Sequence, residues 1–413
     1  MPDKVLLDLG EMYVSDFLAD DDNDYGSRSK DPLTLILDEE IGAPRLTRTV
    51  DLDKMYGRYW YRSGTNASMT NQLREIAEEV CSRIKYKSGD IWLDIACNDG
   101  TMFRFIPDQF TKLGIDPCDD TYLETSSSVA DCVIQDYFSR DAYDRTGHGD
   151  KKCKVITTIA MFYDLDNPTE FINDVYDILD DDGVWVVQMS YTPLMLRQMA
   201  FDNICHEHVY YHSLSSMQRL VEPCGFKIMD CSLNDTNGGS FRIYLQKKTA
   251  SDISFGTKPL RDVCKFRVDS LLHHEISDSR SQQEIWLDFE KNLNEMKEKT
   301  VSFVRQELAA GKKIYGYGAS TKGNTLLQYY GLDHNDIVAI AERSPAKFGL
   351  KTVGSNIPIV SEKEMRAAKP DYLIVLPWHF IKEFVSRESD FLNSGGKFIV
   401  PCPEFKVIGK DDV

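Results

Sequence analysis

Short apolar runs that alternate with helical segments are the feature that most limits the fold of this chain. Each run is almost continuously hydrophobic, which is typical of strands buried on both faces of a parallel sheet. Helices must then cover both faces, so the pattern predicts a doubly wound α/β architecture. In the first half of the chain, the runs are at residues 90–95, 112–117, 132–134, 153–158 and 183–189.

The same alternation begins again near the C-terminus and predicts a second doubly wound unit. A strand at 313–318 enters a glycine turn, and further apolar runs follow it. These later runs are at 337–340, 372–376 and 397–400. The predicted fold class is therefore α/β, with two Rossmann-like doubly wound parallel-sheet domains.

The remaining segments predict a domain order along the 413 residues. The first 70 residues are short apolar pieces between acidic loops, which indicates a small, irregular, partly β N-terminal module. Residues 258–310 are charged and carry one apolar stripe, as expected of a connecting helix that packs on its neighbours. The expected domains are 1–70, 71–250, a helical connector at 251–310, and 311–413.

The formal net charge of −18 limits the partners that this chain can have. Such a field repels phosphates, so binding to nucleic acid or to anionic membranes is not expected. No apolar run approaches the ~20 residues needed to cross a bilayer, and no secretory signal is evident. The 10 cysteines are scattered without a C-x-x-C pair, which indicates a cytoplasmic protein without a cysteine zinc site. We expect a monomer or a homodimer.

The turn after the first strand of the middle domain is a candidate nucleoside site. Ligands of open parallel sheets bind beyond the carboxyl ends of the strands, where this turn lies. It contains neither G-x-G-x-x-G nor a Walker loop, so a nucleoside without phosphates, such as S-adenosylmethionine, fits better than a dinucleotide. Asp116, after the second strand, is placed to bind a ribose diol, and Asp136, after the third, to reach the adenine amino group. A plain structural turn is the alternative. The candidate cofactor residues are Asp94, Ala96, Asn98, Asp99, Gly100, Asp116, Pro117 and Asp136.

Segment 201–211 contains the most unusual motif of the chain, His206-Glu207-His208. On an extended chain, the alternate spacing places His206 and His208 on one side. Three interpretations are open: a metal site, which lacks a clear third ligand, a structural cluster, or a general base. We favour the general base, because histidine takes up a proton near neutral pH and the segment follows the fifth strand of the nucleoside-binding unit.

An aromatic cluster near the end of the N-terminal module contains Tyr56, Tyr59, Trp60 and Tyr61. Such residues either pack domains together or present a hydroxyl that hydrogen-bonds a developing oxyanion. Tyr59 and Tyr61 are the candidates for the second role.

The second glycine turn, at 315–325, links a strand to a helix and is a candidate diphosphate cradle. Backbone N–H groups at a helix start favour anions, and the spacing matches neither a dinucleotide fingerprint nor a Walker loop. A structural turn with an exposed lysine is the alternative. With Ser63 from the aromatic segment, the candidate substrate residues are Tyr317, Gly318, Ala319, Ser320, Lys322, Asn324 and Arg343.

Six motifs, in this order along the chain, resemble those of the three-domain sugar C-methyltransferases, which act on nucleotide-linked deoxyketosugars in antibiotic biosynthesis. The His-Glu-His and Gly-Tyr-Gly-Ala-Ser motifs are the most specific of them. The motifs occupy residues 59–64, 95–100, 201–208, 238–242, 316–325 and 343–349.

The resemblance implies a zinc-binding N-terminal module, a middle domain that binds S-adenosylmethionine, a C-terminal domain that helps to hold a nucleotide diphosphate, and His208 as the base. This chain departs from the family at three places. Around Asp38 and Ile41, where the family has its second pair of zinc-binding cysteines, there is no thiol, so no metal is expected. The tyrosine that precedes His-Glu-His in the family is Cys205 here, and the first glycine of the nucleoside turn is Ala96.

These features predict C-methylation of a nucleotide-linked keto-deoxysugar through an enolate. His208 removes the proton next to the ketone, and Tyr59 or Tyr61, with Glu207 or His206, supports the enolate oxygen. The carbon then attacks the sulfonium methyl group in line. Three alternatives stay open: O- or N-methylation, a non-catalytic relative that binds the nucleotide sugar, and an NAD-linked oxidoreductase, which the missing G-x-G-x-x-G disfavours.

Overall fold

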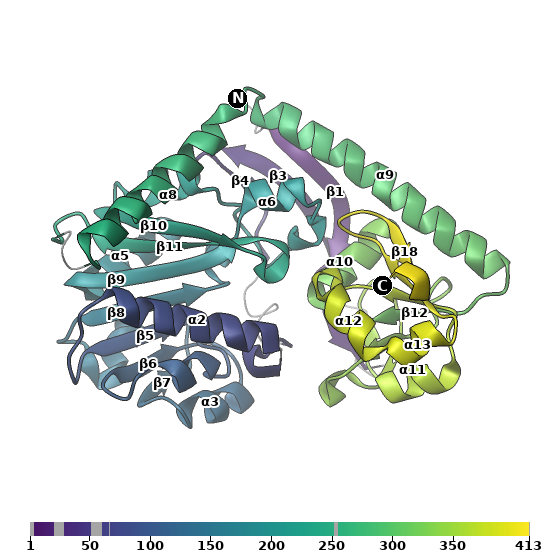
Figure 1. Cartoon of the computed structure of the whole chain (residues 1–413), viewed down its shortest axis with the longest axis horizontal. Helices are drawn as coiled ribbons and strands as arrows, with labels where there is room; N and C mark the ends of the chain where they lie inside the picture. The colour runs from purple at the N-terminus through teal and green to yellow at the C-terminus, as the bar shows by residue number, and fades with distance from the viewer. Residues whose placement is uncertain (1–3, 20–28, 51–59, 66, 252–254, 413) are drawn as a thin grey trace.

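The computed structural model describes residues 4–19, 29–50, 60–65, 67–251 and 255–412. A seven-stranded sheet lies on the left-hand side of the molecule in Figure 1. The strand order is β10-β11-β9-β8-β5-β6-β7, with β5 to β9 running parallel. These five parallel strands are the ones predicted from the apolar runs. They are β5 (Ile91–Ile95), β6 (Thr111–Ile115), β7 (Cys132–Ile134), β8 (Cys153–Ile159) and β9 (Leu179–Ser190).

A hairpin that the apolar pattern does not reveal completes this sheet. Its strands, β10 (Phe226–Asn234) and β11 (Ser240–Lys247), are antiparallel to each other, and β11 is antiparallel to β9. The expectation of a wholly parallel sheet was therefore wrong at this edge. Asp230 interrupts β10 and Arg242 interrupts β11, so neither strand is a continuous apolar run.

Helices cover both faces of the sheet, and each buries an apolar side. In α2 (Ala67–Arg83), buried residues recur at helical spacing on the predicted face: Leu73, Ile76, Ala77 and Val80. Two apolar cores result, one on each face of the sheet. The other helices of this unit are α3 (Asp120–Ser127), α4 (Arg140–Tyr143), α5 (Pro168–Ile178), α6 (Thr192–Arg197) and α7 (Leu214–Val221).

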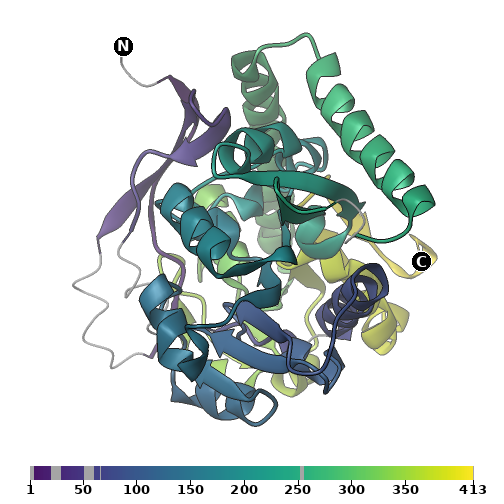
Figure 2. The same ribbon diagram turned by 90° about the vertical axis from the view of Figure 1, so that its left-hand side faces the viewer.

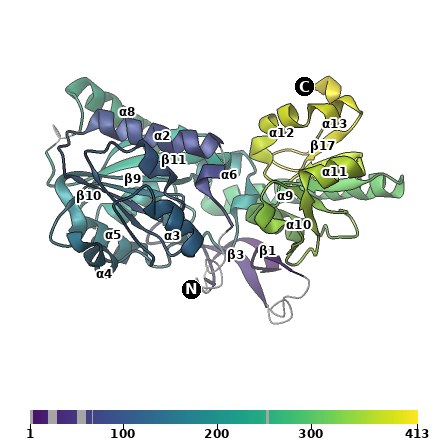
Figure 3. The ribbon, with the colours of Figure 1, turned by 90° about the horizontal axis from the view of Figure 1, so that it is seen from below.

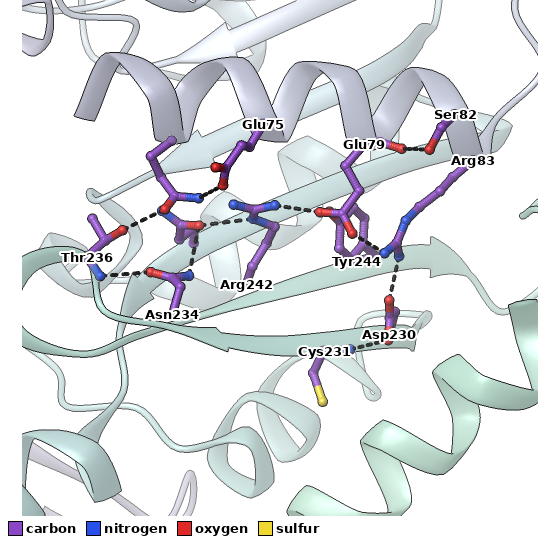
Figure 4. Close-up of polar contacts among 12 residues, drawn as sticks. Glu75, Glu79, Ser82, Arg83, Asp230, Cys231, Asn234, Thr236, Arg242 and Tyr244 are labelled. Carbon is purple, nitrogen blue, oxygen red and sulfur yellow. Dashed lines mark hydrogen bonds and ion pairs between the residues drawn. The ribbon is translucent and has the colours of Figure 1, made fainter. Parts of the chain in front are cut away.

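A network of ion pairs joins α2 to the hairpin (Figure 4). Glu79 of α2 accepts a hydrogen bond of 2.5 Å from Arg242 of β11. Arg83 of α2 ion-pairs at 2.5 Å with Asp230 of β10, which is completely buried. Burial alone would raise the pKa of Asp230, but hydrogen bonds from Arg267 and Arg83 hold it below its ordinary value. Because Arg267 lies on α8 (Lys258–Ser277), Asp230 ties two helices to the sheet.

The C-terminal part contains a second, six-stranded sheet in the order β15-β13-β12-β16-β17-β18. All neighbouring strands are parallel except β17 and β18. Its strands are β12 (Ile314–Tyr317), β13 (Ile340–Glu342), β15 (Ile359–Ser361), β16 (Tyr372–Val375), β17 (Lys397–Val400) and β18 (Lys406–Ile408). Its helices are α10 (Thr321–Tyr330), α11 (Glu362–Ala368), α12 (Ile381–Arg387) and α13 (Ser389–Asn393).

One predicted strand of this sheet is displaced. The apolar run 337–340 mostly precedes β13, which begins at Ile340. Val338 and Ala339 already hydrogen-bond the backbone of β12, but the ladder with β15 on the other side starts only at Ile340. The apolar run therefore begins where the chain enters the core, three residues before β13 is paired on both sides.

Two long helices, and not one, connect the two sheets. α8 lies against the seven-stranded sheet and α9 (Gln282–Ala309) against the C-terminal unit, so the pair forms an inverted V (Figure 1). Ser281 and Glu284 form a capping box, in which each side chain accepts a hydrogen bond from the backbone N–H of the other residue. This S-x-x-E pattern starts a new helix at a place where the apolar stripe alone indicates none.

The N-terminal strands share a core with α9 and the C-terminal sheet. Leu33 and Leu35 belong to one apolar cluster with Trp286 and Phe289 of α9. Figure 2, which looks onto the seven-stranded unit, shows these strands at one side of the molecule, and Figure 3 shows β1 and β3 between the two α/β units. The antiparallel strands are β1 (Val5–Tyr13), β3 (Lys30–Asp38) and β4 (Ala43–Leu46), whereas β2 (Phe17–Leu18) pairs with β14 (Lys351–Thr352) of the C-terminal unit.

The domain boundaries given above stay a prediction. Among the parts of the chain that the structure describes, no helix is both long enough and apolar enough to cross a membrane.

We expect Asp230→Ala to lower the free energy of unfolding by about 3–5 kcal/mol, because it removes the buried carboxylate that pairs with both Arg83 and Arg267 and leaves Arg83 with Glu79 alone. Urea unfolding followed by circular dichroism measures the effect. Asp278→Ala is the matched control, since it removes a carboxylate from an exposed ion pair with Arg280 and should cause no measurable change. Equal effects of the two substitutions would contradict this account of the network.

Candidate active site

A cavity of about 160 Å³ opens at the carboxyl ends of β5, β6 and β8, where the sequence places the nucleoside site. The predicted residues that line it are Asp94, Ala96, Asn98, Asp116 and Pro117. Apolar side chains from α2 and from other segments complete the wall: Met69, Met102, Phe138, Met161 and Leu165. A cavity with a mostly apolar wall and a few carboxylates suits a purine nucleoside.

Asp116 fixes the turn that follows β5. One of its carboxylate oxygens accepts the N–H of Asn98 at 2.7 Å, and the other accepts the N–H of Cys118 at 2.8 Å. Each carboxylate oxygen has two lone pairs, so Asp116 can still accept hydrogen bonds from a ribose diol. The turn itself needs a left-handed backbone at Ala96, Asn98 and Gly100, with φ of 59°, 52° and 72°.

Asn98 and Asp99 hold a second segment over the turn. The Asn98 side chain accepts the N–H of Ser63 and donates to the carbonyl of Tyr61, both at 3.0 Å. Asp99 accepts the N–H of Gly64 at 2.9 Å. Because of these contacts, Tyr61 and Ser63 lie on the cavity wall, whereas Asp99 and Gly100 support the turn from behind.

Two predicted acids have other partners. Asp94 lines the cavity, but one of its oxygens accepts the hydroxyl of Thr157 at 2.6 Å, and burial raises the pKa of Asp94 to about 7. Asp136 does not line the cavity, and it ion-pairs with Arg145. The neighbours of Asp136, Tyr137 and Phe138, line the cavity instead, and no sequence motif marks them.

The His206-Glu207-His208 segment is not extended, so the expectation that both histidines share one side is wrong. The chain turns at 206–207, and the N–H of His208 donates to the carbonyl of Cys205 at 3.2 Å. As a result, His206 contacts the carbonyl of Asp31 in β3 at 3.1 Å, whereas His208 packs on Tyr163 with ring centroids 4.0 Å apart.

His208 is held without a proton at neutral pH. Burial first, and then the charge of Lys322, lower the pKa of His208 well below its ordinary value, and the backbone of Asn203 hydrogen-bonds the ring. Burial also raises the pKa of Glu207 to about 7, against the opposing charge of Lys322. The segment therefore presents a neutral imidazole and a carboxyl group that titrates near neutral pH.

Other residues of this region either line the cavity or pack against their neighbours. Tyr163 packs on His208, and the next residue, Asp164, lines the cavity, so the two places adjoin. Although Tyr61 is 39% exposed as a residue, loss of water around its hydroxyl and the nearby Asp99 raise its pKa, so the hydroxyl stays protonated as a hydrogen-bond donor. Trp60 packs edge-on against Phe17, with ring centroids 5.6 Å apart. The predicted Tyr59 and its neighbour Tyr56 lie outside the described residues.

The second glycine turn is closed by contacts within the protein. Gly318 adopts φ of 83°, and the N–H of Ala319 donates to Glu342 at 2.9 Å. Ser320 caps α10 by accepting the N–H of Gly323 at 3.0 Å. The Glu342 carboxylate thus accepts one of the N–H groups that the predicted cradle would offer to a phosphate.

The side chains around this turn point to other partners as well. Tyr317 is buried and donates to Glu388 at 2.7 Å, and Asn324 is buried inside the C-terminal core. Lys322 reaches out of its own unit and donates to Asn203 at 2.6 Å. Of the predicted substrate residues here, Arg343 alone among the described ones presents an exposed cation, 3.9 Å from Glu383.

No group of three or more metal-ligating side chains occurs among the residues that the structure describes. The sequence expectation of no metal stays a prediction.

Comparison with known proteins agrees with the fold and the cavity. Residues 68–230 match the methyltransferase domain family, and residues 235–403 match the C-methyltransferase C-terminal domain. The C-methyltransferase NovU of Streptomyces niveus is 26% identical over 414 aligned residues, which cover 98% of this chain and 94% of NovU.

Two solved structures are each similar to somewhat less than half of the chain. One is from the Haloferax volcanii complex between the Trm112 methyltransferase activator and a methyltransferase, with 12% identity, coverage of 45% of this chain and 94% of that chain, and a TM-score of 0.36. The other is the glycopeptide N-methyltransferase MtfA complexed with S-adenosylmethionine, with 12% identity, coverage of 46% and 96%, and a TM-score of 0.33.

The doubly wound sheet, the cavity at its carboxyl edge and the domain match define an S-adenosylmethionine-dependent methyltransferase. With both matched domains in order along the chain, the protein belongs to the C-methyltransferase family that carries this C-terminal domain.

We expect isothermal titration to show binding of S-adenosylmethionine and S-adenosylhomocysteine but not of NAD. Asp116→Asn should weaken S-adenosylmethionine binding by about 10-fold or more, since a hydrogen bond to a charged group contributes about 1.5–3 kcal/mol. Asp136→Asn is the control and should leave the affinity unchanged, because Asp136 pairs with Arg145 away from the cavity. The opposite ranking of the two variants would refute this placement of the nucleoside.

Proposed function

We propose that this protein methylates a carbon atom of a nucleotide-linked keto-deoxysugar through an enolate. The observation that carries the proposal is His208, a buried imidazole that stays neutral and adjoins the cofactor cavity through Tyr163. A methyl transfer to oxygen or nitrogen does not require a carbanion, whereas transfer to carbon requires a base that removes a proton from that carbon. The name of the relative NovU, a C-methyltransferase, agrees with such a base.

The residues around the cavity suit the two reactants differently. Bound S-adenosylmethionine supplies an electrophilic methyl group, and Asp116, Asn98 and the apolar wall would hold its nucleoside part. On the acceptor side, His208 removes the proton next to the ketone. Tyr61, with its protonated hydroxyl on the cavity wall, then donates a hydrogen bond to the enolate oxygen.

Glu207 is a second candidate for the base. A general base works best when its pKa lies near the working pH, and the pKa of Glu207 is about 7. His208 accepts a proton less readily, because burial keeps its pKa low. We retain His208 as the base and assign Glu207 and His206 to its support, and the test below separates these roles. Tyr59, which lies outside the described residues, keeps its proposed place beside the enolate oxygen.

The nucleotide part of the acceptor is assigned to the C-terminal unit. Arg343 offers an exposed cation at the end of β13, and Ser63 offers a hydroxyl on the cavity wall. Tyr317, Ser320 and Asn324 are engaged in contacts within the protein, so their part in binding is to shape the turn at Gly318 and Ala319.

The decisive measurement is solvent deuterium exchange at the carbon next to the ketone of a nucleotide keto-deoxysugar, followed by NMR. The wild-type protein should catalyse this exchange, and His208→Asn should lower it by roughly 10²-fold or more while leaving calorimetric binding of S-adenosylmethionine unchanged. Glu207→Gln is the matched variant. Loss of exchange in Glu207→Gln alone would move the base to Glu207, and methylation without any exchange in the wild type would overturn the enolate route.

A further inference from the structure

The loop that precedes His206 is attached to the C-terminal unit. The thiol of Cys402 donates to the carbonyl of Met199 at 2.9 Å, and the ring of Tyr330 stacks on Phe201, with centroids 5.5 Å apart. The indole N–H of Trp378 donates to Asp202 at 3.1 Å. Segment 199–203 therefore belongs to the middle unit by sequence but is positioned by residues of the C-terminal unit.

Lys322 of the C-terminal unit also contacts this segment, and Asn203 connects it to His208. Its ammonium group donates to the side chain of Asn203 at 2.6 Å, and the side-chain amide of Asn203 donates to the carbonyl of Ala200 at 3.1 Å. The backbone of the same Asn203 hydrogen-bonds the His208 ring. A single buried asparagine thus links a lysine of α10 to the imidazole of the His-Glu-His segment.

The surroundings of Lys322 contain several acids and neutral histidines. Its charge lowers the pKa of Asp202 and Glu207, in each case against the larger effect of burial, and it adds to burial in lowering the pKa of His208. The other titratable groups that face this region are Asp16, Tyr163, Asp164, Cys205 and His379. They come from the N-terminal segment, the loop after β8, the His-Glu-His loop and the C-terminal unit.

We propose that Lys322 is a positioning residue of the reaction centre, which docks the His-Glu-His loop through Asn203 and sets the charge that Glu207 and His208 carry. This inference rests on the proposed function in one respect, that the His-Glu-His loop is the reaction centre. It gives the C-terminal unit a role in the chemistry in addition to holding the acceptor. It also replaces the sequence expectation that Lys322 contacts a diphosphate.

The direction of the effect follows from the sign of the charge. A cation favours the ionised carboxylate of Glu207 and disfavours the protonated imidazole of His208. Without Lys322, both groups keep a proton to higher pH. The acidic limb of the pH profile for deuterium exchange therefore moves to higher pH whichever of the two groups is the base.

Three variants separate the charge of Lys322 from its packing. Lys322→Met removes the charge and keeps an aliphatic stem, and Lys322→Gln is the second choice if the first does not fold. Lys322→Arg restores the charge. Lys382→Gln is the matched control, because it removes an exposed lysine from α12 in the same unit. Circular dichroism and calorimetric binding of S-adenosylmethionine verify that each variant is folded.

The first readout is the titration of the Glu207 carboxyl carbon by ¹³C NMR without any acceptor, assigned by its absence in Glu207→Gln. In the wild type the pKa is about 7. Lys322→Met should raise it by roughly one unit, which lowers the ionised fraction at pH 7 from about one half to about one tenth, and Lys322→Arg should return it to the wild-type value. An unchanged titration in folded Lys322→Met or Lys322→Gln overturns the proposal.

The second readout is the pH profile of exchange, with kcat separated from KM. The proposal predicts an acidic limb displaced to higher pH, with a lower kcat on that limb, whereas a diphosphate contact predicts a higher KM with an unmoved limb, which would overturn it. Because the NMR titration needs no acceptor, it can succeed even if C-methylation of a keto sugar is not found. In that case the proposed function fails and the role of Lys322 in the loop stands.

Discussion

The site depends on one hydrogen bond. A carboxylate at the end of one parallel strand accepts it from the turn that follows the neighbouring strand. Asp116 holds the N–H of Asn98, and the side chain of Asn98 in turn carries Tyr61 and Ser63 onto the cavity wall. The strained turn at Ala96 and Asn98 persists because this carboxylate accepts its N–H group. Without Asp116, the cavity would lose the support both of the turn after β5 and of the segment with Tyr61 and Ser63.

The second sheet contains the same kind of hydrogen bond between a carboxylate at a strand end and a neighbouring turn. Glu342, at the end of β13, accepts the N–H of Ala319 in the turn after β12. In the first sheet, the turn held by the acid borders a cavity, whereas in the second the turn has a further contact on its other side, because Lys347 donates to the carbonyl of Ala319. From the C-terminal unit, Lys322 and Trp378 hydrogen-bond the loop of the middle unit at Asn203 and Asp202.

Local pattern was sufficient to predict much of the fold but little of the side-chain arrangement. The parallel strands were predicted because a strand buried on both faces is apolar at nearly every position. The hairpin β10–β11 was missed because Asp230 and Arg242 are buried as ion pairs, and a buried ion pair has no hydrophobic signature. The break before α9 was missed although Ser281 and Glu284 spell a capping box, which is a local signal that could have been read.

For the site, the backbone positions of the turn were predictable, and its long-range partners were not. Asp116 follows from its place at a strand end. By contrast, the pairing of Asp136 with Arg145, the separate directions of His206 and His208, and the contact of Lys322 with Asn203 depend on how distant segments pack. Such contacts produce no recognisable spacing pattern in the sequence, since the partners meet only in the tertiary structure.

The pairing of the first strands with the last domain has a consequence for the order in which this protein is made. Tyr13 hydrogen-bonds Gln328, 315 residues further along the chain, and β2 completes a small sheet with β14. Such a distant contact can close only after Gln328 has been synthesised, while the seven-stranded sheet can assemble from segments that leave the ribosome earlier. Until α9 has been synthesised, the leucines of β1 and β3 lack the helix that covers them, so this apolar surface stays exposed while the middle unit folds.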